Sequence, residues 1–360
     1  MDFDLTEEQR IVQKMTRDFA EKEIVPVARD NDRNERFPED IIKKMGPLGL
    51  LGGPIPEEYG GSGFDSITHA IVTEEIGRAC SSVRTVLSVH VSLCQQTILQ
   101  WATEEQKKKF IPDLAAGKRL GCFGLTEPDA GSDPASLAAT AVKKGDKYVL
   151  NGNKMWISNA GVSEVALIFA TVDKSKKYKG ITAFILDRKE SPYKTVDIHG
   201  KLGLRSSNTS EIIMEDVEVP EENVLGEVGG GFKVAMSALD HGRYSVAAGC
   251  VGVAQASIDA SVKYAQERQQ FGRPIGTFQL VQALIAEMIV DTEAARLLVY
   301  RAGHVKNKGL RSTREVCLAK YFASEAAIRA ANNAIQVHGG YGYSDEYPVE
   351  RYMRDARVAT

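Results

Sequence analysis

The middle of this chain carries strand patterns with no helical segment among them, and helical patterns lie on both sides. From about Gly121 to Val219, short runs rich in β-branched and aromatic residues follow one another, for example residues 165–171 and 181–186. A series of βαβ units would require a helix between successive strands. The sequence therefore predicts a separate antiparallel β domain between two helical domains.

Capping and turn signals give the boundaries of these domains. Capping boxes begin helices at Thr6-Glu7-Glu8-Gln9 and Thr103-Glu104-Glu105-Gln106. Gly229-Gly230-Gly231 precedes three long helical patterns, at about residues 232–268, 277–308 and 312–337. We predict an α+β protein with an N-terminal helical domain (residues 1–118), a central antiparallel β domain (119–228) and a C-terminal four-helix-bundle-like domain (229–360).

Two further structural predictions follow from the same patterns. Asn151-Gly152 separates strand-like residues 147–150 from residues 154–157, and Asn-Gly accepts the positive φ angles of a type I′ turn. A β-hairpin is therefore predicted there. The C-terminal helices carry wide apolar stripes, and extended helices of this kind usually bury their free faces in an oligomer.

Charge and composition exclude several classes of function. The formal net charge is -3 and no segment is dominated by Lys and Arg, so nucleic acid is not an expected partner. No apolar run approaches the roughly 20 residues of a membrane-spanning helix. The five cysteines lack CxxC or Cys/His spacing, so no metal site is expected.

The common nucleotide and hydrolase signatures are also missing from the sequence. No GxGxxG follows a strand, and neither a Walker A motif nor a GxSxG elbow is present. The chain starts without a basic segment followed by an apolar core. We expect a cytoplasmic bacterial protein or, if a transit peptide has been removed, a protein of the mitochondrial matrix.

Two motifs of the β domain suggest a ligand. Thr126 and Ser132 offer hydroxyl groups on a loop in which Gly131 permits close backbone approach, although such residues more often form an ordinary turn. In Trp156-Ile157-Ser158 the tryptophan supplies an aromatic wall, although a Trp buried in the core is the default explanation.

Two motifs of the C-terminal domain suggest an anionic ligand. Arg268 ends the first long helix, where it either complements the helix dipole or binds a pyrophosphate. Gly339, Gly340 and Gly342 follow the third long helix. One glycine suffices to end a helix, and the additional glycines expose backbone amides that a ligand can use.

In their order and spacing, these motifs resemble the acyl-CoA dehydrogenase family over residues 5–360. The diagnostic pieces are Leu125-Thr126-Glu127-Pro128, Gly131-Ser132-Asp133, Trp156-Ile157-Ser158, Glu267-Arg268, Phe271-Gly272, residues 336–342 and Glu346-Tyr347-Pro348-Val349-Glu350-Arg351. The resemblance implies the three-domain fold of that family and FAD as the cofactor. It also implies a homotetramer, because some FAD-binding positions come from a neighbouring subunit.

The resemblance assigns roles to individual positions. Those matching the flavin-ring contacts are Phe123, Leu125, Thr126, Trp156, Ile157 and Ser158. Those matching the contacts to the adenosine-diphosphate half are Arg268, Phe271, Gln279, Gln336, Gly339 and Gly340. Gly131 and Ser132 match contacts near the pyrophosphate and the CoA chain, and Asp240 and Arg243 match CoA-binding positions.

The implied reaction is α,β-dehydrogenation of an acyl-CoA thioester to the trans-2-enoyl-CoA. A Glu base takes the α-proton, the β-hydrogen leaves as hydride to flavin N5, and an electron-transferring flavoprotein accepts the electrons. In most relatives the base lies in a segment that corresponds to residues just beyond Thr360. In a minority it lies at the position of Gly242. We therefore expect no catalytic base within residues 1–360 and place it beyond Thr360.

Arg84 is the most informative departure from simple acyl-CoA dehydrogenases. It lies in the helix that resembles the wall of the acyl pocket, where glutaryl-CoA dehydrogenases carry an Arg opposite the substrate's distal carboxylate. Benzylsuccinyl-CoA dehydrogenases have a comparable substrate. The resemblance therefore implies a substrate with a terminal or branch carboxylate. The alternative is that Arg84 pairs with a protein carboxylate or faces solvent.

Three other functions remain open at this stage. The first is a short-chain, butyryl-like acyl-CoA dehydrogenase without carboxylate recognition. The second is an acyl-CoA oxidase, which the length of the chain disfavours because such oxidases are generally longer. The third is a non-catalytic family member that binds flavin or acyl-CoA, for which the absence of a base is the only support.

Overall fold

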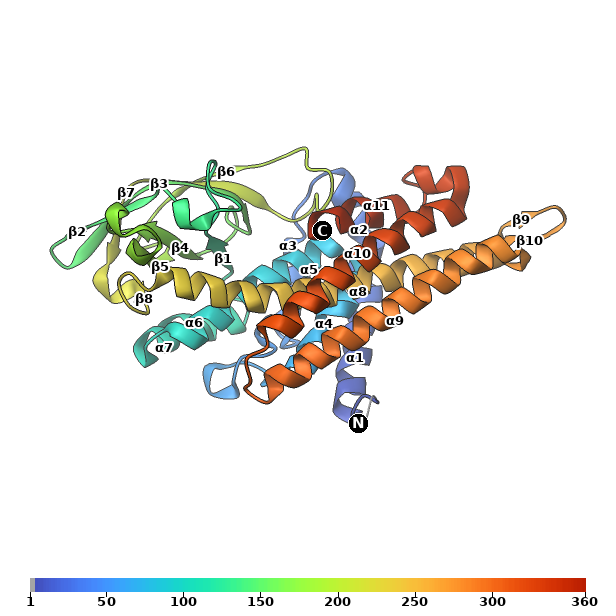
Figure 1. The fold of residues 1–360 in the computed structure, drawn as a ribbon, viewed down its shortest axis with the longest axis horizontal. Coiled ribbons are helices and arrows are strands. Elements are labelled where there is room, and N and C mark those ends of the chain that lie inside the picture. Colours follow the sequence, from blue (N-terminus) through green and yellow to red (C-terminus); the bar gives the residue numbers. More distant parts are fainter. Residues whose placement is uncertain (1–3) are drawn as a thin grey trace.

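The computed structural model describes residues 4–360, which form the predicted succession of helices, β domain and helices. The β domain lies at one end of the molecule, and the long C-terminal helices extend to the other end (Figure 1). The first three residues, part of the segment used to predict the cellular location, lie outside the described residues. The predicted fold class is confirmed.

The N-terminal domain is helical, and both predicted capping boxes are present. Its α-helices are α1 (Glu7–Phe19), α2 (Val25–Arg33), α3 (Glu39–Met45), α4 (Ser66–Ala79), α5 (Ser81–Leu87), α6 (Gln96–Trp101) and α7 (Glu104–Ala115). π-Helical turns at Ala20–Ile24 and Ser88–Gln95 join α1 to α2 and α5 to α6. Sequence periodicity did not predict these turns, which occur frequently at functional sites.

The β domain contains one large sheet. Its strands are β1 (Gly121–Gly124), β2 (Thr140–Lys144), β3 (Lys147–Ser158), β4 (Val165–Thr171), β5 (Ile181–Asp187), β6 (Lys194–Asp197), β7 (Thr209–Pro220) and β8 (Val224–Leu225). They follow the order β6-β7-β3-β2-β4-β5-β8, and β1 pairs with β4. Most pairs are antiparallel, as predicted, but β1 and β2 each run parallel to β4.

The hairpin predicted at Asn151-Gly152 is wrong. These residues lie inside β3, where the register against β7 shifts between Leu150 and Gly152. Gly152 has a φ of 133°, so the conformational freedom of Asn-Gly serves a bulge here instead of a turn. The turn lies earlier, at Gly145 between β2 and β3.

The C-terminal domain consists of long helices. They are α8 (Gly231–Glu267), α9 (Gln279–Asn307), α10 (Thr313–His338) and the short α11 (Val349–Ala356), with a small hairpin of β9 (Gln269–Gln270) and β10 (Arg273–Pro274) after α8. The N-terminus of α8 packs on β5, since a Cβ on Gly231 would meet the backbone of Thr182 and Ala183. The helix therefore runs from the β domain to the opposite end of the molecule (Figure 1).

By length and composition alone, α8 is long and apolar enough to cross a membrane, which the sequence analysis did not predict. In the fold, 72% of the most apolar 18-residue stretch of α8 is buried inside the protein. Glycines allow this burial, because Gly249 and Gly252 of α8 meet the backbone of α4 around Gly77. The apolar composition of α8 is thus accounted for by its place in the core.

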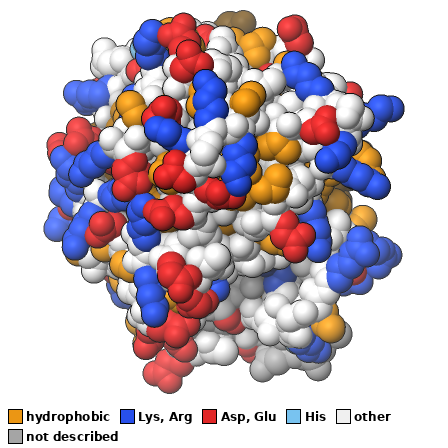
Figure 2. Space-filling view, turned by 90° about the vertical axis from the view of Figure 1, so that its left-hand side faces the viewer, with side chains coloured by type: hydrophobic (Ala, Val, Ile, Leu, Met, Phe, Trp, Pro, Cys, Tyr) orange, Lys and Arg blue, Asp and Glu red, His pale blue; other side chains and the backbone are white. Residues whose placement is uncertain are grey.

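The surface combines charges of both signs with exposed apolar side chains, several of which lie on α9 and α10. At the β-domain end, basic and acidic side chains are interspersed (Figure 2). On α9 and α10, large apolar side chains remain exposed, namely Leu280, Ile289, Val290, Leu297, Leu318 and Tyr321. An exposed apolar face of this kind marks an interaction surface.

Candidate active site

The end of β1 and the loop after it, with Phe123, Leu125 and Thr126, form one wall of the candidate site. Phe123 and Leu125 are buried and Thr126 is half-buried. The carbonyl of Thr126 accepts a hydrogen bond from the backbone N–H of Met155, at 2.9 Å. This bond joins two motifs that lie about 30 residues apart in the sequence, as sites built on a sheet commonly do.

Trp156 lies at an irregularity of β3. The register against β7 shifts between Lys154 and Ile157, and Trp156 has a φ of 63°. Its side chain is 59% exposed, so the default explanation of a Trp buried in the core is wrong. Ile157 is buried and Ser158 half-buried on the same strand. The bulge therefore turns a large aromatic surface outward, available to a planar ligand.

A buried ion pair supports this wall and was not predicted from the sequence. Lys154 Nζ lies 2.7 Å from Glu127 Oε1, and both side chains are almost fully buried. The Glu127 carboxylate also accepts hydrogen bonds from the backbone N–H groups of Ala138 and Ala139. Burial lowers the pKa of Lys154, and the Glu127 carboxylate opposes that shift. The pair fixes the loop of the Leu125-Thr126-Glu127-Pro128 motif on β3.

Gly131 and Ser132 lie further along that loop, and both are exposed. No atom lies within 4 Å of a Cβ placed on Gly131. The backbone there is open to a ligand, which agrees with the expected close approach.

A second group of predicted residues meets in a cavity beyond the end of α8. Arg268, Gly339 and Gly340 line this cavity of about 590 Å³, together with Tyr264, Gln270, Ile275, Val337, His338, Tyr341, Ser344 and Glu346. The Arg268 guanidinium lies 5.6 Å from the centre of the Tyr341 ring. No atom lies within 4 Å of a Cβ placed on Gly339 or Gly340, so their backbone is accessible.

The other residues predicted for the adenosine-diphosphate half lie at the same end of the molecule. Phe271 is 92% exposed between β9 and β10, and its ring contacts Phe278. Gln279 and Gln336 are exposed. Phe271 thus projects from the chain with most of its ring surface open to solvent.

The two groups of predicted residues are separated along α8. The end of β3 bonds Val86 of α5 through Asn159, and Ser88 bonds Ser245 in the middle of α8. At 1.5 Å per residue, the 22 residues of α8 that follow Ser245, up to Glu267, span about 33 Å. The flavin-ring residues therefore lie beside the middle of α8, and Arg268 follows its far end.

Arg84 lies on α5 and is only 5% exposed. Its Nε is buried without a hydrogen-bond partner, and none of the described carboxylates lies within ion-pair distance of the guanidinium. Burial lowers its pKa below the usual arginine value. The stem lies on α8, where a Cβ on Gly249 would be 2.5 Å from Arg84 Cδ. Both ordinary alternatives, a protein carboxylate and solvent, are therefore wrong.

The predicted CoA positions form a small network on α8. Arg243 Nη1 lies 3.1 Å from Asp240 Oδ1, and Thr313 donates to the other oxygen of Asp240 at 2.7 Å. Both side chains remain partly exposed. At the alternative position of the base, a Cβ on Gly242 would lie 2.6 Å from Leu93 Cδ2. Asp240 and Glu127 are both held by hydrogen bonds and ion pairs, so neither is free to act as a base. The location of the base beyond Thr360 stays a prediction.

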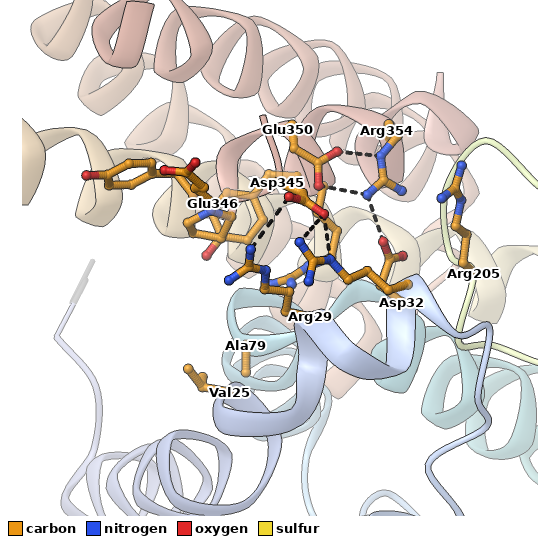
Figure 3. A pocket seen from close by; sticks show the side chains of 14 residues that line it. Val25, Arg29, Asp32, Ala79, Arg205, Asp345, Glu346, Glu350 and Arg354 are labelled. Carbon is orange, nitrogen blue, oxygen red and sulfur yellow. Dashed lines mark hydrogen bonds and ion pairs between the residues drawn. The ribbon is translucent and has the colours of Figure 1, made fainter. Parts of the chain in front are cut away.

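A separate polar pocket of about 380 Å³ lies between α2 and the segment around α11. Arg29 and Arg33 pair with Asp345, and Arg354 lies between Asp32 and Glu350 (Figure 3). The sequence analysis did not predict this cluster. Because its acids and bases largely satisfy one another, it serves to attach α11 to α2.

The comparisons with known proteins settle the family. Models of the acyl-CoA dehydrogenase N-terminal, middle and C-terminal domains match residues 6–118, 122–217 and 229–360. This chain belongs to the acyl-CoA dehydrogenase family. It is an oxidoreductase of a family that depends on FAD.

Similar proteins act on different acyl groups. The chain is 47% identical over 361 residues to glutaryl-CoA dehydrogenase of Desulfococcus multivorans, covering 99% of this chain and 92% of that protein. It is 44% identical over 358 residues to the short-chain specific acyl-CoA dehydrogenase of Clostridium acetobutylicum, covering 99% and 94%. A solved glutaryl-CoA dehydrogenase in complex with glutaryl-CoA has a TM-score of 0.96 and 45% identity, covering 100% and 92%.

Proposed function

We propose that this acyl-CoA dehydrogenase oxidises an acyl-CoA whose acyl group carries a distal or branch carboxylate, as glutaryl-CoA and benzylsuccinyl-CoA do. The observation that carries the proposal is the buried guanidinium of Arg84 without a carboxylate partner. A buried charge that lacks a partner is destabilising by several kcal/mol. A substrate carboxylate removes that penalty, and a guanidinium binds it in a fixed, bidentate orientation.

Short-chain dehydrogenation is the second candidate, since a short-chain specific enzyme is a relative of similar identity. A butyryl group has no anion for Arg84. Binding it would leave the guanidinium buried and unpaired, so the contact gives discrimination as well as affinity. A catalytic role is supported by the relatives of similar identity, which are dehydrogenases.

The residues around Trp156 and Arg268 fit FAD. The exposed indole of Trp156 offers an aromatic surface beside Thr126, whose hydroxyl supplies a hydrogen-bonding group. Arg268 and the open backbone of Gly339 and Gly340 offer a cation and amides for a pyrophosphate. FAD supplies the acceptor for the hydride that leaves the β-carbon.

The chain's own residues bind and orient the acyl group. The hydrogen bond from Arg243 to Asp240 orients the guanidinium that would bind CoA. Arg84 fixes the far end of the acyl group. Holding both ends restricts the reacting carbons to one place along the wall formed by β1 and β3, which lowers the entropic part of the barrier.

A homotetramer and an electron-transferring flavoprotein complete the proposal. The separation of Trp156 and Arg268 along α8 supports assembly, in which a second chain would bring its Arg268 and neighbouring residues to the wall at Trp156. The exposed apolar side chains of α9 and α10 give that second chain a surface to cover.

The test compares Arg84→Gln with the unmodified enzyme on glutaryl-CoA, benzylsuccinyl-CoA and butyryl-CoA, following flavin bleaching without oxygen. We expect kcat/KM for the carboxylate-bearing substrate to fall by at least about 100-fold, because a buried charge-assisted contact is worth about 3 kcal/mol or more. Butyryl-CoA turnover should be unchanged or improve. Equal losses on all substrates would contradict carboxylate recognition by Arg84.

A further inference from the structure

Asn159 is a buried asparagine that joins the helix of Arg84 to the β domain. It follows Ser158 at the end of β3 and is completely buried. Its Nδ2 donates to the carbonyl of Val86 at 3.2 Å and to the carbonyl of Gly121 at 3.3 Å. Its backbone N–H donates to the carbonyl of Asn208 at 2.9 Å. A single amide thus connects α5, β1 and the end of β3.

The partners of Asn159 lie next to the two ends of the proposed acyl site. Val86 comes two residues after Arg84 on α5, and Gly121 comes two residues before Phe123 on β1. Ser158 of the flavin-ring group directly precedes Asn159. The amide therefore ties the backbone of α5, two residues from Arg84, to the backbone of β1, two residues from Phe123.

The joint around Gly121 is tightly packed. A Cβ on Gly121 would lie 2.4 Å from Cys94 Sγ, and its N–H donates to His90 Nδ1 at 3.0 Å. Asn159 itself has a φ of 68°, and its Oδ1 is buried without a partner. A residue held in this conformation persists because the surrounding structure determines it, and such residues concentrate at functional sites.

We propose that Asn159 is a positioning residue that matches the distance between Arg84 and the flavin-ring wall to the length of a dicarboxylic acyl group. A group held at both ends reacts only when that distance is right. A monocarboxylic acyl group has no anchor on α5 and tolerates a change in the distance. The inference rests on the proposed function, because it requires the substrate carboxylate to bind Arg84.

The test uses Asn159→Ser, which keeps one short donor, and Asn159→Asp, which keeps the size and removes both donated bonds. Asn223→Ser is the control, since Asn223 is also buried in the β domain and lies outside this joint. Each variant is purified with its flavin. Thermal midpoint, flavin content and kcat/KM are then measured for butyryl-CoA and for succinyl-, glutaryl- and adipyl-CoA.

We expect kcat for glutaryl-CoA to fall by about 10-fold or more in the Asn159 variants, because a misplacement of about 1 Å can cost about 100-fold. Butyryl-CoA should change by less than about twofold. A CoA thioether that ends in a carboxylate binds without being oxidised, so calorimetry measures its affinity alone. In the Asn159 variants this affinity should weaken by a much smaller factor than kcat falls. The preference among the three dicarboxylic substrates should also broaden.

Four outcomes would overturn the inference. Losses on glutaryl-CoA and butyryl-CoA of the same size would make Asn159 merely structural, and activities equal to those of the Asn223→Ser control would exclude any role. If Arg84→Gln discriminates between the substrates while the Asn159 variants do not, only the inference fails. If Arg84→Gln itself fails to discriminate, the proposed function fails and the inference fails with it.

Discussion

The buried ion pair between Lys154 and Glu127 gives the sharpest prediction about stability. Replacing Lys154 with Met leaves the Glu127 carboxylate in a site that is almost fully buried, with only the backbone N–H groups of Ala138 and Ala139 as donors. Removing one partner of a buried pair costs about 3–5 kcal/mol in the free energy of unfolding. The core around Phe169 joins the β domain to α7 and α8, so the 360 residues unfold as one unit. At about 2.1 cal/mol/K per residue, a loss of about 3 kcal/mol then lowers the thermal midpoint by about 4 °C.

The same variant should also retain FAD poorly, because the pair attaches the loop after β1 to β3 beside Trp156. Thermal unfolding followed by circular dichroism measures the midpoint, and the ratio of flavin to protein absorbance measures retention. Lys147→Met is the matched control on the same strand. Lys147 lies 2.5 Å from Glu218, but both side chains are about half exposed, and such pairs contribute about 0–1 kcal/mol.

A double variant separates charge from packing. In Lys154→Met with Glu127→Gln, the single amide oxygen accepts from one of the two backbone N–H groups that Glu127 binds, and no unpaired charge remains buried. We expect the double variant to recover most of the lost stability. The reasoning is refuted if Lys154→Met unfolds at the midpoint of Lys147→Met, or if the double variant is less stable than Lys154→Met alone.

Two further predictions concern Gly249 and Asp355. Gly249→Ala places a Cβ 2.5 Å from Arg84 Cδ and so displaces the guanidinium. We expect kcat/KM for glutaryl-CoA to fall about 10-fold or more, while kcat/KM for butyryl-CoA is largely kept. An unchanged ratio of the two values would contradict the placement of Arg84. Burial raises the pKa of Asp355 from 3.8 to about 6, so the folded protein keeps a proton that the unfolded chain has lost between these values. The free energy of unfolding should therefore decrease by about 3 kcal/mol as the pH rises from about 4 to about 6. Urea titrations of Asp355→Asn should lack this decrease, and parallel pH profiles for the two proteins would contradict it.

Local signals in the sequence predicted much of the fold. The capping boxes at Thr6 and Thr103 act through atoms three residues apart, so they need no tertiary information. The hairpin prediction at Asn151-Gly152 was wrong because a turn and a bulge both need a residue with positive φ. Only the pairing of β3 with β7 decides which of the two forms. The π-helical turn before α6 was missed because its apolar residues are buried all round and leave no periodic signal.

The candidate site could be predicted less completely. Motifs specified which residues belong to it, and the cavity beside Arg268 contains Gly339 and Gly340 as expected. The sequence offered no direct signal for Lys154, since a lysine on a strand is ordinarily exposed and becomes a buried partner only when Glu127 arrives from a distant loop. The sequence analysis also missed Asn159, because the carbonyls that it bonds lie 73 and 38 residues away.

The sequence by itself determined the order of the domains and the family, and it gave the predicted FAD and CoA contacts, because these depend on short motifs and local patterns. The tertiary structure decided the state of individual charges and the distances between motifs. Arg84 was an arginine with three possible environments, and folding against Gly249 left it buried without a partner. The packing of α5 against the middle of α8 placed the residues around Trp156 and those around Arg268 at different points along that helix. Both results come from long-range packing, which no stretch of the sequence specifies alone.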